Sequence, residues 1–170
     1  SNEMNNTLEN VQNSAQNNAS TLGFDTSHVW KHSTKVARVE WKNMVGTASG
    51  TFQLVACAHF YDVSQLGAIC TKGVSPVPWQ GNPAPRTAES PSGMVNAVGL
   101  QNPGVDHYLV DELPKLKKLG ALVITNVAGH SDDDYAQVVE KLADSSADML
   151  EINVSCPNVT HGGMSVGTDP

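Results

Sequence analysis

The sequence predicts an α/β fold of the parallel (β/α) TIM-barrel type, and two observations support this prediction. Apolar strand-like runs alternate with helical patterns along the chain, which is typical of parallel strands joined by right-handed crossovers. Polar residues follow the predicted strands, where the active sites of such barrels are built. These residues are Ser49, Lys72, Asn126 and Asn153.

The chain divides into a polar N-terminal segment and one predicted domain. Seven asparagines fall within the first twenty residues, and so polar a segment buries too little apolar surface to form a core. We therefore expect residues 1–28 to be an Asn-rich tail without a catalytic role. Residues 29–170 supply four β/α units. A full barrel has eight strands and about 250 residues, so we expect the N-terminal half of one.

Four core strands and one hairpin are expected. Residues 29–42 have a strand-like pattern, and a hairpin turn is predicted at residues 32–34. The core strands are predicted at residues 44–48, 68–71, 121–125 and 149–152.

Two helices are predicted before the third core strand. The first fits residues 55–66, with Gly67 as its C-terminal cap. The second begins near Asp106, is interrupted at Pro114 and stops at Gly120.

The third helix has the clearest start signal. Ser131 is a suitable N-cap, and the three aspartates that follow it suit the positive end of the helix dipole. Its apolar stripe at helical spacing is Tyr135, Val138, Val139 and Leu142.

Residues 74–104 contain most of the prolines of the chain. No regular element is expected at that density of proline. A loop of this length inside a compact domain is usually functional.

Composition excludes several classes of function. The formal charge is −7, from 10 Lys and Arg against 17 Asp and Glu, which argues against a nucleic-acid-binding surface. No apolar run is long enough to cross a bilayer, and residues 1–20 lack the pattern of a secretory signal. The three cysteines and six histidines show no metal-ligand spacing. We therefore expect a cytoplasmic protein without a metal site.

The residues at the strand ends suit a flat, polar ligand. Amides both donate and accept hydrogen bonds, so they match a heterocycle that carries carbonyl and N–H groups. Lys72 adds a positive charge for an anionic group. Glu151, on the last strand, is expected to be a paired structural carboxylate inside the barrel.

Cys156 fits two roles equally well on pattern alone. It is either a small buried apolar residue or a thiolate that acts as a base or nucleophile. Pro157 favours an extended conformation for it. A cysteine hydrolase would need a histidine base, for which His161 is the candidate.

Several motifs together resemble the class 1 dihydroorotate dehydrogenases over residues 43–170. Residues 99–104, Gly-Leu-Gln-Asn-Pro-Gly, and the pair Gly162-Gly163 resemble subclass 1B, the NAD-linked branch. The motifs that carry the resemblance are Ala48-Ser49-Gly50-Thr51-Phe52, Thr71-Lys72, Gly81-Asn82-Pro83-Ala84-Pro85-Arg86, residues 96–104, Asn126-Val127-Ala128-Gly129 and Asn153-Val154-Ser155-Cys156-Pro157-Asn158.

The resemblance implies an FMN enzyme that oxidises dihydroorotate to orotate in pyrimidine synthesis. Cys156 would be the base that takes a proton from C5 of the substrate while hydride leaves C6 for the flavin. The implied FMN contacts are Ser49, Lys72, Gly73, Asn126 and Asn153. The implied substrate contacts are Lys72, Asn96, Ala97, Val98, Gly99, Leu100, Asn153 and Asn158.

The resemblance also implies a homodimer and a partner subunit that carries FAD and an iron–sulfur cluster. A half barrel leaves open sheet edges, so we expect this chain alone to bind FMN poorly and to be inactive. Two alternatives remain open. One is a cysteine-dependent hydrolase or transferase on a barrel scaffold, and the other is a non-catalytic half-barrel assembly module.

Overall fold

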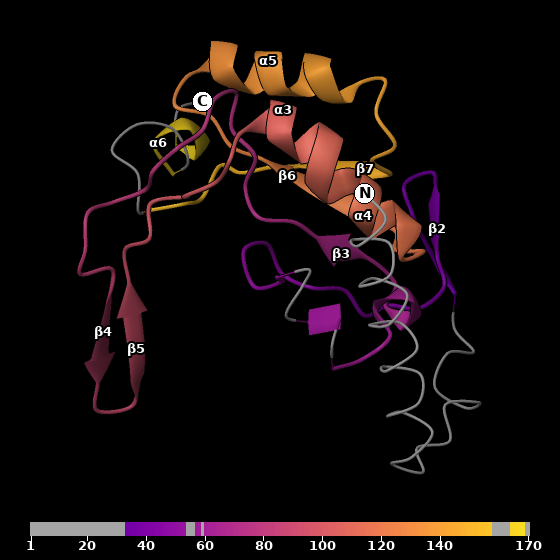
Figure 1. The fold of residues 1–170 in the computed structure, drawn as a ribbon, viewed down its shortest axis with the longest axis horizontal. Helices are drawn as coiled ribbons and strands as arrows, with labels where there is room; N and C mark the ends of the chain where they lie inside the picture. Colours follow the sequence, from indigo (N-terminus) through magenta and orange to yellow (C-terminus); the bar gives the residue numbers. More distant parts are fainter. Residues whose placement is uncertain (1–32, 54–56, 59, 158–163, 169–170) are drawn as a thin grey trace.

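The computed structural model describes residues 33–53, 57–58, 60–157 and 164–168. Figure 1 shows the fold. The strands are β1 (Thr34–Val36), β2 (Val39–Trp41), β3 (Ile69–Cys70), β4 (Thr87–Ser90), β5 (Gly93–Asn96), β6 (Val123–Val127) and β7 (Met149–Ile152). The helices are η2 (Val63–Gln65), α3 (Val105–His107), η3 (Tyr108–Glu112), α4 (Leu113–Lys118), α5 (Asp132–Leu142) and α6 (Met164–Gly167).

A parallel sheet with the order β3-β6-β7 forms the centre of the fold. Ile69 of β3 pairs with Val123 of β6, and Asn126 of β6 pairs with Glu151 of β7. In Figure 1, α5 and the helix formed by α3, η3 and α4 lie on the same side of β6 and β7. The predicted parallel α/β arrangement is therefore confirmed.

The core lies between this sheet and its helices. Val123 and Val127 of β6 are fully buried and belong to one apolar cluster with Leu113, Leu116 and Val138. Burying such side chains contributes about 1.5–3 kcal/mol each. No helix among the described residues is long and apolar enough to span a membrane.

The helix over residues 105–118 is continuous but widens in its middle. The Leu113 N–H donates to the carbonyl of Tyr108, five residues back, which is the hydrogen bond of a π-turn. Pro114 follows at once; proline has no N–H and its ring clashes with the carbonyl four residues earlier. The wider turn relieves that clash, so the predicted interruption takes the form of a π-turn within one helix.

Helix α5 begins and packs as its sequence predicts. The Ser131 hydroxyl accepts a hydrogen bond from the Asp134 N–H, 3.3 Å away. Tyr135, Val138 and Leu142 are buried against the core, so the predicted stripe is the packed face.

The first hairpin turns later than predicted. Thr34 lies inside β1, and β1 reaches β2 through Ala37 and Arg38. Ala37 has a φ of 53°, a conformation uncommon for alanine. Because glycine and asparagine are the usual signals for such a turn, the sequence pattern did not reveal it. His32 lies outside the described residues.

The first predicted core strand is reduced to one parallel bridge, between Gly46 and Ala68. Glycine inside a strand weakens the pairing. Gly67 is not a helix cap: its N–H donates to the carbonyl of Val45 at 2.8 Å. A Cβ on Gly67 would lie 2.1 Å from the Asn43 carbonyl oxygen, so glycine is needed there for close backbone approach.

The helix predicted at residues 55–66 does not reach its predicted end. Residues 54–56 and 59 lie outside the described part, and residues 57–58 are helical. From residue 60 to Leu66 the chain forms only the 3-10 turn η2. The Asp62 carboxylate accepts from the Ser64 N–H and starts this new turn. Leu66 is already extended.

The proline-rich loop contains a hairpin that the sequence analysis did not expect. Strands β4 and β5 pair from Thr87↔Asn96 to Ser90↔Gly93. Both strands are exposed along their whole length, and Figure 1 shows them extending away from the sheet. The prediction failed because the prolines lie before the hairpin, in its turn and, at Pro103, after it, so both strands are free of proline.

Candidate functional site

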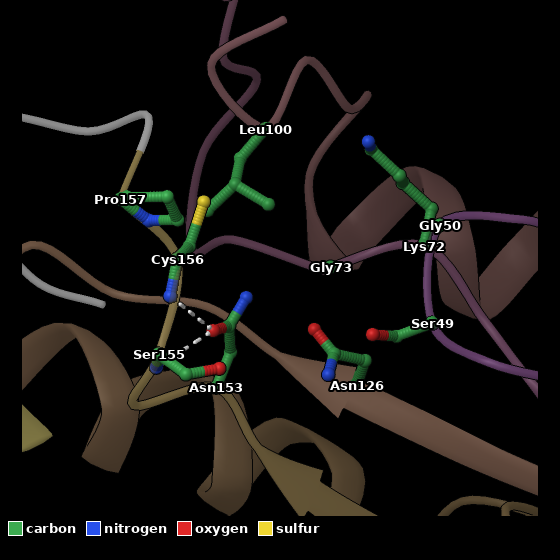
Figure 2. A pocket seen from close by; sticks show the side chains of 10 residues that line it. All are labelled: Ser49, Gly50, Lys72, Gly73, Leu100, Asn126, Asn153, Ser155, Cys156 and Pro157. Carbon is green, nitrogen blue, oxygen red and sulfur yellow. Dashed lines mark hydrogen bonds between the residues drawn. The ribbon is translucent and has the colours of Figure 1, made fainter. Parts of the chain in front are cut away.

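One pocket gathers the residues that follow the strands of the parallel sheet (Figure 2). Its volume is about 250 Å³. The lining residues are Ser49, Gly50, Lys72, Gly73, Leu100, Asn126, Asn153, Ser155, Cys156 and Pro157. They come from five segments far apart in the sequence, which meet because parallel strands place their C-terminal ends at one edge of the sheet.

The segment after β7 is held by the side chain of Asn153. Its Oδ1 accepts hydrogen bonds from the backbone N–H groups of Ser155, at 3.3 Å, and Cys156, at 3.2 Å. The Tyr135 hydroxyl donates to the Asn153 carbonyl at 2.7 Å. Figure 2 shows the two hydrogen bonds to Asn153 Oδ1 and the Cys156 sulfur pointing toward Leu100. The half-buried thiol is therefore presented to the pocket by a fixed turn.

Asn126, at the end of β6, is the most deeply buried polar residue of the pocket. It is 2% exposed. Its Nδ2 donates to Glu151 Oε1 at 2.6 Å, while its Oδ1 is buried and has no hydrogen-bond partner. In Figure 2 this oxygen is directed into the pocket. A buried carbonyl without a donor is costly, so this atom marks a place for a donor from a ligand.

Glu151 contacts neutral groups rather than a cation. Beside the Asn126 amide, it accepts from the Cys70 thiol at 3.3 Å. Burial, with smaller contributions from the hydrogen bond to Glu151 and its charge, raises the pKa of Cys70 to about 12, so this thiol stays protonated at neutral pH. The expected paired carboxylate is thus hydrogen-bonded by an amide and a thiol, and no ion pair joins it to any described residue.

Two glycines leave space at the positive side of the pocket. Gly50 has a φ of +75°, and a Cβ there would lie 3.6 Å from the Lys72 Nζ. A Cβ on Gly73 would lie 3.1 Å from Asn126 Oδ1 and 3.3 Å from Leu100 Cδ2. The Lys72 ammonium makes no ion pair with the described part of the chain. Its charge is available to an anionic ligand.

Only the last residue of the predicted substrate run reaches the pocket. Leu100 lines it, with a φ of 53°. The neighbouring Asn102 fixes this bend, because its Nδ2 donates to the Leu100 carbonyl at 2.8 Å. The other members lie away from the pocket; they are Asn96, Ala97, Val98 and Gly99. Asn96 ends β5 of the exposed hairpin and the other three follow it, and Gly99 packs closely against Asn82.

The structure thus brings together all the residues predicted to contact FMN, together with Cys156. Asn158 and His161 lie outside the described residues. Sequence reasoning missed three lining residues, Gly50, Ser155 and Pro157. Each is a direct neighbour of a predicted site residue, and this adjacency was the available signal.

The described residues give no support to a metal centre or to a Cys–His pair. No group of His, Cys, Asp and Glu among them is placed to hold a metal ion. None of the described histidines lines the pocket with Cys156. His130 instead stacks on Trp79, with ring centroids 3.8 Å apart.

Comparison with known proteins identifies relatives along most of the chain. A family model described as dihydroorotate dehydrogenase matches residues 31–170. The chain is 51% identical over 136 residues to the dihydroorotate dehydrogenase B (NAD(+)) catalytic subunit of Alkaliphilus metalliredigens, covering 79% of this chain and 45% of that protein. The corresponding subunit of Listeria innocua is 50% identical over 131 residues, covering 76% of this chain and 43% of that protein.

The chain therefore spans less than half the length of these curated relatives. Among solved structures, DHODH from Eimeria tenella in complex with ferulenol matches with a TM-score of 0.56 and 23% identity. That match covers 75% of this chain and 37% of the other. At this identity the likeness concerns the fold, and it agrees with the predicted barrel type.

Proposed function

Because the chain belongs to the dihydroorotate dehydrogenase family, we propose that it is part of an enzyme that oxidises dihydroorotate to orotate with FMN in pyrimidine biosynthesis. The observation that carries the proposal is the pocket itself. Cys156, Lys72 and two asparagines from different strands converge on one cavity, and their chemistry matches a proton acceptor, a cation and polar contacts for flat rings.

The residues of the pocket fit FMN. The partnerless, buried Oδ1 of Asn126 calls for an N–H donor, which a flavin ring carries. Gly50 and Gly73 line the pocket without side chains, which leaves room for a flat ring. A Cβ on Gly73 would lie 3.1 Å from Asn126 Oδ1, whereas one on Gly50 would make only ordinary contacts. We assign cofactor binding to Ser49, Lys72, Gly73, Asn126 and Asn153. When bound, FMN supplies the acceptor for the hydride that leaves the substrate.

Cys156 is proposed as the base. Its Sγ takes the proton from C5 of dihydroorotate, while the hydride leaves C6, so that a C5–C6 double bond forms. The turn held by Asn153 Oδ1 fixes the cysteine backbone, and a fixed base is worth about 10²–10⁴-fold in rate. The substrate contacts proposed from the family resemblance are Lys72, Asn96, Ala97, Val98, Gly99, Leu100, Asn153 and Asn158, of which Lys72, Leu100 and Asn153 line the pocket.

The parallel sheet is proposed to be the first four β/α units of an eight-stranded barrel. Residues 1–28 would be a polar extension of it. The relatives are named as catalytic subunits linked to NAD(+), which supports an electron-transfer partner that carries FAD and an iron–sulfur cluster. We further propose a homodimer of the full-length subunit in the cytoplasm. The isolated chain would bind FMN weakly and show no turnover.

The test uses the full-length subunit that contains this chain. Cys156→Ala should retain the visible flavin spectrum and lower dihydroorotate oxidation by at least about 10²-fold. Cys57→Ala, a thiol outside the pocket, is the matched control and should remain active. Near-full activity in Cys156→Ala would show that the base has been misassigned. A colourless protein that gains no flavin spectrum with added FMN would refute the cofactor assignment.

A further inference from the structure

The amide of Asn126 and the carboxylate of Glu151 face each other across β6 and β7. We propose that Glu151 is a positioning residue that fixes which end of the Asn126 amide faces the pocket, so that the ligand group bound there must be a hydrogen-bond donor. The identity of the ligand rests on the proposed function, but the orientation of the amide does not.

The sheet register explains why these two side chains meet. Asn126 and Glu151 are directly paired residues of neighbouring parallel strands, so their side chains leave the same face of the sheet. The distance from Asn126 Nδ2 to Glu151 Oε1 is 2.6 Å. A carboxylate oxygen can only accept. The opposite amide orientation would put two acceptor oxygens at this distance, and their repulsion excludes it.

Cys70 on β3 strengthens this arrangement from the other side. Its Sγ lies 3.3 Å from the same Glu151 Oε1, and a thiol that stays protonated can only be the donor in this contact. Glu151 Oε1 thus receives donors from two neighbouring strands. This contact restrains the rotation of the carboxylate and, through it, of the amide.

The carbonyl end of the Asn126 amide determines which ligand groups can bind beside it. Asn126 Oδ1 lies beside Gly73 and is buried without a partner, although backbone contacts hold the residue itself in place. A ligand N–H at this point would satisfy the carbonyl, whereas a ligand carbonyl would place two acceptors together. An imide N–H of a flavin or pyrimidine ring is the kind of group that fits.

The first experiment measures the amide orientation in the 170-residue chain by NMR, with no ligand added. Selective ¹⁵N labelling and an Asn126→Asp spectrum assign the side-chain NH₂ signal of Asn126. Glu151→Ala should move that signal and speed its hydrogen exchange, because its acceptor is lost. Glu140→Gln, which removes a carboxylate of α5 that lies outside the pocket, is the control and should leave it unchanged. An unmoved signal in Glu151→Ala would overturn the proposal.

The second experiment measures FMN affinity in the full-length subunit by quenching of flavin fluorescence. Glu151→Gln should weaken FMN binding by about two- to tenfold, the value of one hydrogen bond, because glutamine accepts either amide orientation. Asn126→Asp should weaken it further, since two carboxylates then face each other. The double variant, Asn126→Asp with Glu151→Gln, should bind FMN more tightly than Asn126→Asp alone. In it the glutamine amide would donate a hydrogen bond to one aspartate oxygen, and the other aspartate oxygen would face the pocket.

Recovery in the double variant is a readout that a merely structural role would not give. Equal affinity of Glu151→Gln and wild type would overturn the selectivity argument. Additive losses in the double variant would overturn it as well. If wild-type subunit does not bind FMN, the cofactor assignment fails, and the NMR result alone then decides whether Glu151 orients the amide.

Discussion

Replacing Asn126 by leucine should leave the free energy of unfolding nearly unchanged, whereas replacing Asn102 by leucine should lower it by about 3–5 kcal/mol. Both asparagines are buried, with 2% and 7% of their surface exposed. Leucine has the same number of heavy atoms and the same branching as asparagine, so neither change leaves a large cavity. The two sites differ chiefly in how their polar atoms are satisfied.

At Asn126 two effects oppose each other. Leucine removes the hydrogen bond to Glu151, worth about 1.5–3 kcal/mol because the acceptor is charged. It also removes the partnerless Oδ1, whose burial costs about 1–3 kcal/mol. Glu151 is exposed and keeps its bond to Cys70. The net change should therefore lie within about 1 kcal/mol of zero.

At Asn102 all the effects have the same sign. Its Oδ1 accepts from the backbone N–H groups of Ser75, at 3.1 Å, and Gly104, at 2.9 Å. Its Nδ2 donates to the Leu100 carbonyl. Leucine would leave these buried backbone groups unsatisfied, at about 1–3 kcal/mol each.

Urea unfolding of the 170-residue chain, followed by far-ultraviolet circular dichroism, measures both changes. Thermal unfolding gives a second measure, because 1 kcal/mol corresponds to about 2–4 °C in a chain of this size. FMN binding to the full-length subunit should be lost in Asn126→Leu despite its retained stability. An Asn126→Leu chain destabilised as much as Asn102→Leu would refute the view that the Asn126 carbonyl is kept unsatisfied for a ligand.

Three further outcomes are expected from the same chain. Gly67→Ala should lower the free energy of unfolding by several kcal/mol, roughly the cost of a severe core clash, because the new Cβ would lie 2.1 Å from the Asn43 carbonyl oxygen. A urea midpoint equal to that of wild type would contradict this contact. Ser131→Ala should lower stability by about 1 kcal/mol through loss of the α5 cap, and Ser131→Asp should restore it in the same assay. Folding raises the pKa of Cys70 from 9.0 to about 12. Above about pH 9 the folded chain therefore retains a proton that the unfolded chain has lost, so the free energy of unfolding should fall as the pH rises. Cys70→Ala should reduce this pH dependence in unfolding experiments between about pH 8 and about pH 10.

Local sequence signals predicted the elements whose causes are local. Helix α5 formed where Ser131 offers a cap and the apolar spacing matches one helical face. Strand β6 formed around the β-branched run Val123-Ile124-Thr125 and extends through Asn126 to Val127. The alternation of such elements was enough to predict a parallel sheet with polar residues at its C-terminal edge.

One failure occurred where a distant contact decided the conformation, and two occurred where a local hairpin carried no recognisable sequence signal. Gly67 looked like a helix cap, but the approach of the Asn43 backbone explains the glycine. The turn at Ala37 has no glycine or asparagine to mark it. The hairpin β4–β5 lies in a proline-rich region in which only the pairing of two short, exposed strands reveals regular structure.

The sequence by itself determined the class of fold, the family, and the residues that follow each strand, because these depend on periodicity and on motif order. It also predicted an extended conformation for Cys156, because a proline follows it. Only the tertiary structure decided that Asn126 pairs with Glu151 and faces the pocket with an unsatisfied carbonyl. That arrangement depends on the register of β6 against β7, and a register is a relation between two strands that neither strand encodes alone.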